Sequence, residues 1–222
     1  EECPCLDRVV GQQRLHQSGK CNDTDSYTGN KREQEVAVDV LPECFELAAE
    51  KEIEWQMNTN FMGVVNVCRA VLPHMRERGS GRIINISSIA GVMAVPFQGF
   101  YSASKFAIEG YSEALSLEVY PFGIKVCVVE PGDFCTNFTA NRAVSDKTME
   151  SADYGACFRR TMAIIEREEK NGSRPQKLAR TICRLVERRN PPFRTKVGPW
   201  FQVLLARVRW IIPQYFLAKG LR

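Results

Sequence analysis

The stretch Arg82-Ile-Ile-Asn-Ile-Ser-Ser-Ile-Ala-Gly91, with Phe100-Tyr-Ser-Ala-Ser-Lys-Phe-Ala-Ile-Glu-Gly110 behind it, decides the fold of this 222-residue chain. Its first part is a short, nearly continuous apolar run, which is the pattern of a parallel strand covered on both faces. Its second part repeats apolar residues at helical spacing from about Phe100 onward. A strand, a turn and a helix in this order predict an α/β fold, in which ligands bind at the carboxyl ends of the strands.

Three side chains of this stretch suggest a chemical device. Tyr101 and Lys105 are four residues apart, so they share one face of the predicted helix. A nearby ammonium group favours the phenolate; moving a phenol pKa from near 10 to about 7 takes roughly 4 kcal/mol, which a close cation in a partly dry site supplies. Ser88 stands at the carboxyl end of the predicted strand, thirteen residues before Tyr101. We therefore expect Ser88 and Tyr101 to converge on one substrate oxygen.

These residues resemble the short-chain dehydrogenase/reductase family, and the matching segments are 83–91 and 96–110. The resemblance implies a Rossmann-like parallel sheet flanked by helices. It also implies that Ser88 holds the substrate oxygen and that Tyr101 is the general acid/base. Lys105 would lower the pKa of Tyr101 and bind the nicotinamide ribose. Tyr-x-x-x-Lys alone recurs by chance, whereas its combination with the serine strand and the spacing is specific.

The chain after the tyrosine agrees with the resemblance. Residues 124–130 predict a second buried parallel strand. Pro131, Gly132 and Thr136 then match the Pro-Gly-x-x-x-Thr of the family. The resemblance implies that this bend passes the nicotinamide and that the threonine hydroxyl binds the cofactor. Taken alone, Pro-Gly also suits an ordinary turn.

The chain before the serine agrees as well. Residues 53–75 carry apolar side chains at helical spacing and predict a long helix that ends at Gly79-Ser-Gly81. Asn60 and Gly63 in this helix match the Asn-x-x-Gly of the family, whose asparagine holds a water molecule in a proton relay. The alternative is that Asn60 only bonds local backbone.

The match is incomplete at the amino end. Neither the Gly-x-x-x-Gly-x-Gly turn, which holds the cofactor pyrophosphate in the family, nor Asn-Asn-Ala-Gly occurs. Residues 1–44 are atypical, and disorder and a frame-shifted reading are both open. Codons for Gly11-Gln-Gln-Arg14, read one base later, can give Val-Asn-Asn-Ala. No apolar segment follows a basic start, so we expect no secretory signal. Cys3-x-Cys5 lacks zinc-site spacing, so we expect no metal.

The sequence thus predicts three regions: the atypical segment at 1–44, the catalytic part of a Rossmann-fold domain at 45–198, and an amphipathic apolar helix at 199–222. Arg207 and Pro213 argue against a membrane span in the last region. Three roles stay open for it: a cap over the substrate pocket, contact with a membrane surface, and packing against the body or a partner subunit.

Charge is distributed unevenly along the chain. Residues 155–222 hold 16 Lys/Arg and 4 Asp/Glu, or +12; since the whole chain is +4, residues 1–154 carry −8. A basic region can bind nucleic acid or anionic lipid, but no nucleic-acid motif accompanies it. The apolar stripe of a predicted helix at 177–189 favours a solvated charged face. Cysteines in apolar stretches, at Cys68 and Cys127, favour reduced core residues and hence the cytoplasm, with peripheral membrane contact left open.

The function predicted from these observations is an oxidoreductase that transfers hydride between NAD or NADP and an apolar alcohol or ketone. Segments 106–110, 121–125 and 190–194 resemble the branch of 17β-hydroxysteroid and retinol dehydrogenases, so we expect a steroid-, retinoid- or lipid-like substrate. The resemblance also implies a homodimer or homotetramer formed through helices 53–77 and 100–119. The competing hypothesis is a truncated, non-catalytic remnant.

Overall fold

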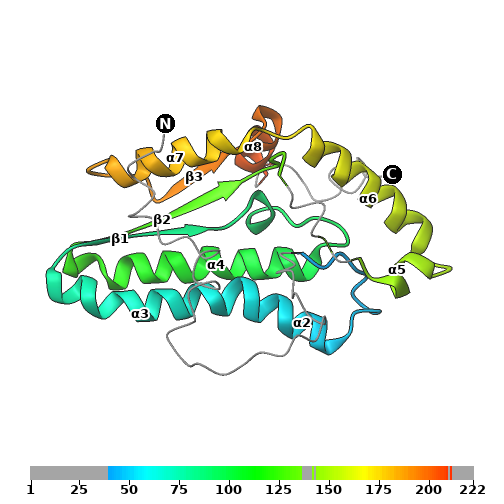
Figure 1. Cartoon of the computed structure of the whole chain (residues 1–222), viewed down its shortest axis with the longest axis horizontal. Coiled ribbons are helices and arrows are strands. Elements are labelled where there is room, and N and C mark those ends of the chain that lie inside the picture. The colour runs from blue at the N-terminus through cyan, green and yellow to red at the C-terminus, as the bar shows by residue number, and fades with distance from the viewer. Residues whose placement is uncertain (1–39, 137–141, 143, 210, 212–222) are drawn as a thin grey trace, which may run out of the picture.

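The computed structural model describes residues 40–136, 142, 144–209 and 211, and the described part forms three layers (Figure 1). A parallel sheet lies between α3 and α4 on one face and α7 on the other. The elements in chain order are α2 (Glu50–Met57), the π-helix η2 (Asn58–Met62), α3 (Gly63–Arg78), β1 (Gly81–Ile86), the 3₁₀ turn η3 (Ile89–Gly91), α4 (Gly99–Glu118), the 3₁₀ turn η4 (Tyr120–Phe122), β2 (Ile124–Pro131), α5 (Asp146–Glu150), α6 (Gly155–Lys170), α7 (Pro175–Glu187), β3 (Arg194–Val197) and α8 (Trp200–Val208).

The sheet confirms the predicted fold class. Its strands are all parallel in the order β1-β2-β3, with Ile84 opposite Cys127 and Val129 opposite Thr195. Helix α4 connects β1 to β2 and makes a βαβ unit, which is the unit that parallel pairing requires. Within the described residues, no strand pairs with the outer edge of β1. The short strand β3 was not predicted from the sequence.

Alternation along β1 divides the core between the two faces of the sheet. Ile83 packs with Ile108 of α4 and Val64 of α3, all of them buried. Ile84 points to the opposite face, where it packs with the cluster around Leu185 of α7. Successive side chains of a strand point to opposite faces, so one apolar strand supports two helical layers.

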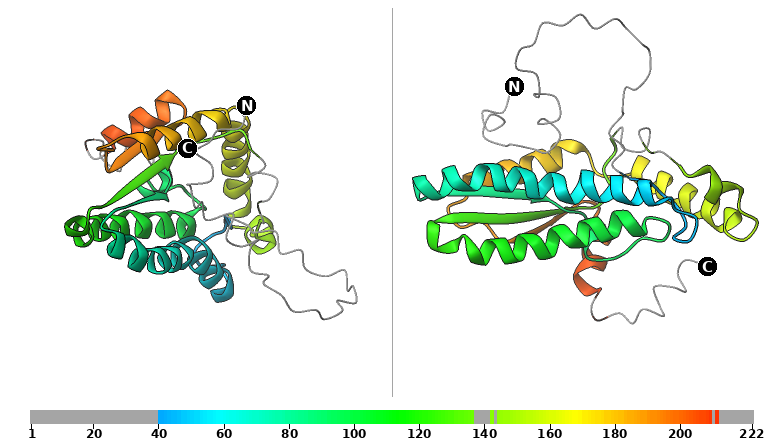
Figure 2. Two further views of the ribbon diagram at one scale, coloured as in Figure 1. Left: turned by 60° about the vertical axis from the view of Figure 1, so that its left-hand side comes forward. Right: turned by 90° about the horizontal axis from the view of Figure 1, so that it is seen from below.

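The helix predicted at 53–75 is present in the structure, but it is less regular than predicted. It begins at Glu50 and widens into a π-helical turn over Asn58–Met62 before α3 continues to Arg78. A π turn accommodates one extra residue and occurs frequently at functional sites. Asn60 in this turn is buried. The helix that contains the turn lies alongside α4 (Figure 2).

Two glycines set the turns that lead into the strands. Gly79 ends α3 with φ +67, and Gly123 ends η4 with φ +71, a region that glycine adopts without steric cost. At Gly123 a Cβ atom would lie 2.6 Å from the carbonyl oxygen of Gly79. The two turns therefore pack backbone against backbone where β1 and β2 begin.

The structure describes only parts of the first and the last predicted regions, 1–44 and 199–222. Val40, Glu43 and Cys44 are buried, and the Glu43 N–H donates to the carbonyl of Phe97 at 2.8 Å. Most of the atypical segment lies outside the described residues, including Cys3, Cys5 and Gly11-Gln-Gln-Arg14. So does the end of the apolar region with Pro213, whereas its first part is α8. No helix of the described chain is both long and apolar enough to span a bilayer.

Candidate active site

Ser88 lies just past β1, where the carboxyl ends of β1 and β2 meet. Its backbone is extended, and its Oγ accepts a hydrogen bond from the Ala90 N–H at 3.0 Å, which caps η3. The same Oγ lies 3.4 Å from the carbonyl oxygen of Pro131, to which it can donate. The structure therefore places this hydroxyl between the two strand ends, at the edge where α/β sheets bind ligands.

Tyr101 and Lys105 lie in the first turns of α4, as the spacing predicted. The Lys105 Nζ is 5.5 Å from the centroid of the Tyr101 ring and donates to the carbonyl of Ile86, the last residue of β1, at 3.4 Å. Helix α4 can pack closely against η3 because Gly91 has no side chain: a Cβ there would lie 3.0 Å from the Lys105 carbonyl oxygen. Tyr101, Lys105 and Ser88 are thus gathered around the carboxyl end of β1, and all three are half-buried, so a ligand can reach them.

Asn60 reaches the same helix through a residue that the sequence analysis missed. Its Nδ2 donates to the Oγ of Ser104 at 3.2 Å, and that Oγ donates to the carbonyl of Tyr101 at 2.7 Å. Asn60 and Ser104 are both buried. The chain of bonds fixes the backbone that carries Tyr101 relative to the π turn. The position of Ser104 three residues after Tyr101 is the sequence signal that could have identified this link.

The predicted cofactor bend follows β2 directly. Pro131 is the last residue of β2, and the Gly132 N–H donates to the Val197 carbonyl at 2.8 Å. A Cβ on Gly132 would lie 2.3 Å from Oε1 of Gln202 in α8, so a larger residue here would displace that side chain. Thr136 is exposed and stands at the end of a described segment.

Gln202 is a second residue that sequence reasoning missed. Its Oε1 accepts from the Asp133 N–H at 2.9 Å, and its Nε2 donates to the Asp133 carboxylate. Burial raises the pKa of Asp133 above its ordinary value, while the Gln202 hydrogen bond opposes that rise. This paired contact attaches α8 to the loop that follows the bend.

A buried charge network supports the strand ends. The Glu130 side chain, in β2, is fully buried and forms an ion pair with Lys196 of β3 at 2.6 Å. Arg194 of β3 donates to Glu109 at 2.9 Å and to Glu113 at 2.6 Å, both in α4. Burial raises the pKa of Glu130, and the bond to Lys196 opposes that rise. The network therefore holds β2, β3 and α4 together one turn beyond Lys105.

The donor set suits one end of a dinucleotide cofactor. A hydroxyl, a phenol and an ammonium at Ser88, Tyr101 and Lys105 can bind sugar hydroxyls and a carbonyl oxygen, and Gly132 lets backbone approach closely. The described residues contain no glycine-rich turn between a strand and a helix that would cradle a pyrophosphate. The site thus fits the nicotinamide half of such a cofactor.

Comparison with known proteins agrees with this geometry. A family model described as short chain dehydrogenase matches residues 39–147. A 3-ketodihydrosphingosine reductase of Bacteroides thetaiotaomicron is 60% identical over 81% of this chain and 66% of its own length. Retinol dehydrogenase 8 of Bos taurus is 34% identical over 67% of this chain and 50% of its own length.

A solved structure resembles the chain in three dimensions. The short-chain dehydrogenase from Streptomyces avermitilis superposes with a TM-score of 0.67 at 32% identity, over 82% of this chain and 64% of that one. The matches span from 40% to 66% of the length of the curated relatives.

Proposed function

Because this chain belongs to the short-chain dehydrogenase family, we propose that it carries the proton-transfer part of a nicotinamide-dependent oxidoreductase site. The observation that carries the proposal is the gathering of Ser88, Tyr101 and Lys105 at the carboxyl end of β1. These groups come from a strand end and from the helix that follows it. The arrangement of such site residues indicates the function more specifically than the fold does, because proteins with this fold catalyse many different reactions.

Each residue has a role that its surroundings support. Ser88 donates its hydroxyl hydrogen to the substrate oxygen in place of the Pro131 carbonyl. Tyr101 gives a proton to that oxygen during reduction and takes it back during oxidation. The ammonium of Lys105 stabilises the phenolate by charge and is itself positioned by the Ile86 carbonyl. Asn60 continues the proton path through a water molecule, and Ser104 holds its amide in place.

The cofactor is NAD or NADP, which supplies or accepts hydride when it is bound. Lys105 and Tyr101 would hold its ribose, and the bend at Pro131 and Gly132 with Thr136 would hold its nicotinamide. The residues that would hold the pyrophosphate are not among those that the structure describes, so the proposal concerns one half of the binding site.

The substrate class that we propose is an apolar alcohol or ketone of lipid-like, steroid-like or retinoid-like character. Two relatives support this class through their names, one a 3-ketodihydrosphingosine reductase and the other a retinol dehydrogenase. The apolar side chains of α8, which is bonded to the loop after Gly132 through Gln202, are consistent with an apolar ligand.

The experiment that tests the proposal is a comparison of Tyr101→Phe with Tyr120→Phe. Tyr120 carries the same phenol but is 80% exposed in η4, beyond the far end of α4, so it is a matched control. Loss of the general acid should lower turnover of a long-chain ketone by about 10²–10⁴-fold, while the control keeps full turnover. Retained activity in Tyr101→Phe would remove the central assignment.

A second candidate function is a non-catalytic form of the family. It is favoured by the unpaired outer edge of β1 within the described residues and by the absence there of a glycine-rich turn. Titration with NADH and NADPH, followed by thermal shift, separates the candidates. Binding of either cofactor supports the enzyme, and no binding at millimolar cofactor supports the non-catalytic form.

A further inference from the structure

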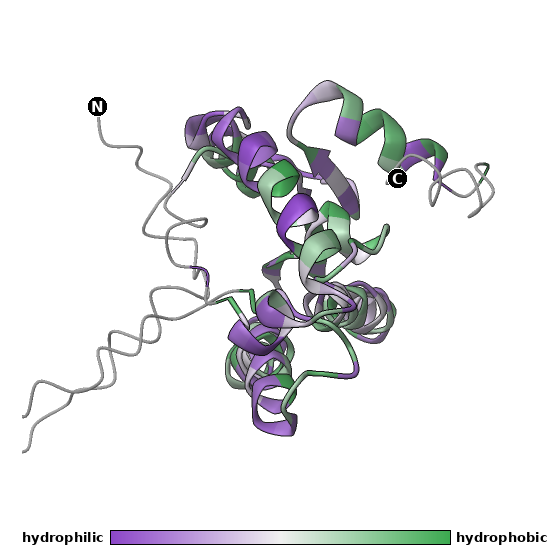
Figure 3. Ribbon diagram, turned by 90° about the vertical axis from the view of Figure 1, so that its right-hand side faces the viewer, coloured by the Kyte–Doolittle hydropathy of each residue, from purple (hydrophilic) through white to green (hydrophobic). Residues whose placement is uncertain are grey.

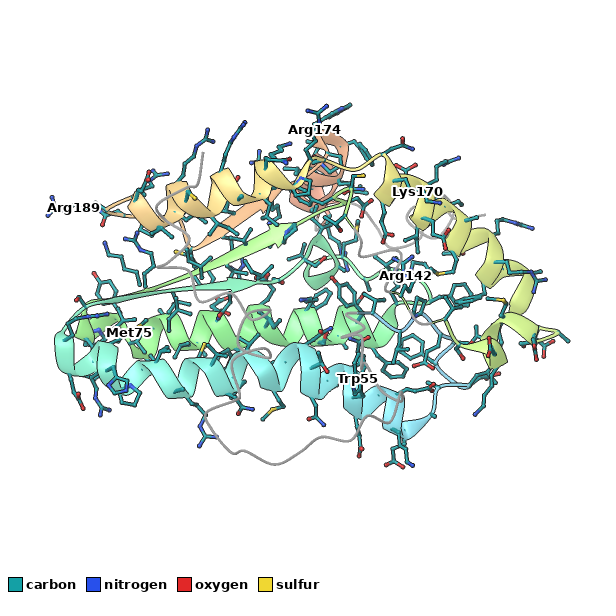
Figure 4. The ribbon with its side chains drawn as sticks, viewed as in Figure 1. Trp55, Met75, Arg142, Lys170, Arg174 and Arg189 are labelled. Atoms are coloured by element: carbon teal, nitrogen blue, oxygen red, sulfur yellow. The ribbon has the colours of Figure 1, made fainter. Side chains whose placement is uncertain are left out.

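The carboxyl-terminal part of the chain concentrates positive charge on one face. Residues 171–222 contain 12 Lys/Arg and a single acidic residue, Glu187. On α7 and its C-cap residue, the exposed cations Lys177, Arg180, Arg184 and Arg188 recur at intervals of three or four residues, so they follow one side of the helix. Figure 4 shows Arg174 and Arg189 near the two ends of this helix, on the side of the molecule away from α3 and α4.

Between α7, β3 and α8 the surface is hollowed into a groove of about 580 Å³. Lys177, Arg184, Arg188 and Arg207 are among the residues that line it, and no carboxylate does. The Nζ of Lys177 donates a hydrogen bond to the Gly198 carbonyl at 2.6 Å. Within the described residues, Arg184, Arg188 and Arg207 form no ion pair. Like charges in one groove repel each other, so the groove is complementary to a ligand with several negative charges.

The wall of the same groove is apolar and belongs to α8. Trp200 is 77% exposed and Leu204 is 51% exposed, and both line the groove. Ile211, beyond the helix, is 82% exposed. Figure 3 shows α8 as one of the more hydrophobic helices of the molecule. Large apolar side chains that remain in water beside a row of arginines mark an interaction surface.

We propose that this cationic groove and the exposed side of α8 form a docking surface for a bilayer that contains anionic lipids. Arginines at such a surface attract lipid phosphates, and Trp and Leu side chains enter the boundary between headgroups and acyl chains. A solvated charged face was predicted for α7, and its cations are exposed in the structure. The structure adds that these cations and the apolar helix α8 lie side by side.

Two other occupants fit the surface less well. A nucleic acid would meet the arginines and could stack one base on Trp200, but Leu204 and Ile211 are aliphatic and offer no ring for further bases. A second copy of the chain, placed by two-fold symmetry, would bring the same arginines of both copies together across the interface. An anionic bilayer satisfies the charge and the apolar side chains at once.

The opposite side of α8 faces the candidate site. Gln202 is two residues from Trp200 and therefore projects from the other side of the helix, where it holds Asp133. One helix would thus contact the bilayer with one side and the loop after β2 with the other.

The test is flotation of the full chain with vesicles of phosphatidylcholine alone or of phosphatidylcholine mixed with phosphatidylglycerol. We expect binding to the mixed vesicles only, with a loss at high salt. Arg184→Gln/Arg188→Gln should weaken partitioning about 30-fold, since each cation near an anionic surface contributes about 1 kcal/mol. The matched control is Arg69→Gln/Arg76→Gln, which removes two exposed cations from α3 on the other side of the sheet.

A second variant separates the apolar contribution from the electrostatic one. Trp200→Ser/Leu204→Ser should weaken binding at every salt concentration, and thermal unfolding monitored by circular dichroism checks that each variant is folded. The proposal is overturned if the mixed vesicles bind no protein or if both arginine pairs have the same effect. It is also overturned if a single-stranded oligonucleotide binds the groove more tightly than the vesicles, or if the serine variant converts a dimer to a monomer in sedimentation.

Discussion

Glu43 offers a sharp test of how burial controls the stability of this chain. Glu43 lies in the segment before α2 and is only 4% exposed. Burial, together with the charge and hydrogen bond of Glu52, raises its pKa from 4.5 to about 7, and the charge of Lys147 opposes the rise. Ionising this carboxylate therefore costs more free energy in the folded state than in the unfolded chain.

The magnitude and the sign follow from the two pKa values. At about 1.36 kcal/mol per pKa unit, a rise from 4.5 to about 7 is equivalent to about 3 kcal/mol. Below pH 4.5 the group is protonated in both states, so it costs nothing. Above about pH 7 it is ionised in both states, and the full penalty applies. The free energy of unfolding of the unmodified chain should fall by this amount between those two limits.

Glu43→Gln removes the penalty and keeps the shape of the side chain. We expect the variant to exceed the unmodified chain in free energy of unfolding by about 3 kcal/mol near pH 8, and to match it near pH 4. Urea titration followed by far-ultraviolet circular dichroism measures both values. The control is Glu54→Gln, the same change at an exposed position of α2. A gain that does not change with pH, or a loss of stability near pH 8, would refute the reasoning.

Three further changes test the packing. Ile108→Ala, at a residue with no exposed surface, should lower the free energy of unfolding by about 3 kcal/mol in urea titration, and a loss below about 1 kcal/mol would contradict the proposed core. Lys196→Met leaves Glu130 buried without its closest cation, so it should lower the free energy of unfolding by about 3–5 kcal/mol at neutral pH. The loss should be smaller in acid, where Glu130 is protonated, and an equal loss at both pH values would count against the ion pair. Gly123→Ala should lower the midpoint of thermal unfolding through about 1–3 kcal/mol of strain, because its φ is +71 and a Cβ would meet the Gly79 carbonyl; an unchanged midpoint would contradict this geometry.

The fold was predictable where the local pattern has one solution. The apolar run before Ser88 and the run at 124–130 are too short for helices and too apolar for an exposed strand, so they indicate buried parallel strands. The strand β3 was not predictable, because Arg194-Thr-Lys-Val197 has the polarity of a loop. In the folded chain it pairs with β2, and Arg194 and Lys196 meet acidic partners on α4 and β2.

Within the candidate site, linear spacing was informative for Tyr101 and Lys105 and uninformative for Gln202. The first two belong to one helix, so their separation fixes their geometry. Gln202 is 69 residues from Asp133, and nothing in the local sequence indicates the pair. Asn60 is intermediate: its motif is visible in the sequence, but its contact with Ser104 depends on a π turn that the apolar pattern does not reveal.

The sequence by itself determined the kind of chemistry that we propose, because a serine strand, a tyrosine and a lysine at fixed spacing are short-range features of one βα unit. The tertiary structure decided what surrounds that unit. It brought Glu130 and Asp133 to partners far along the chain, and it placed the cations of α7 beside the apolar side of α8. Contacts of this kind depend on which faces of helices and strands meet in the folded chain, and charge and hydropathy along the sequence do not specify that meeting.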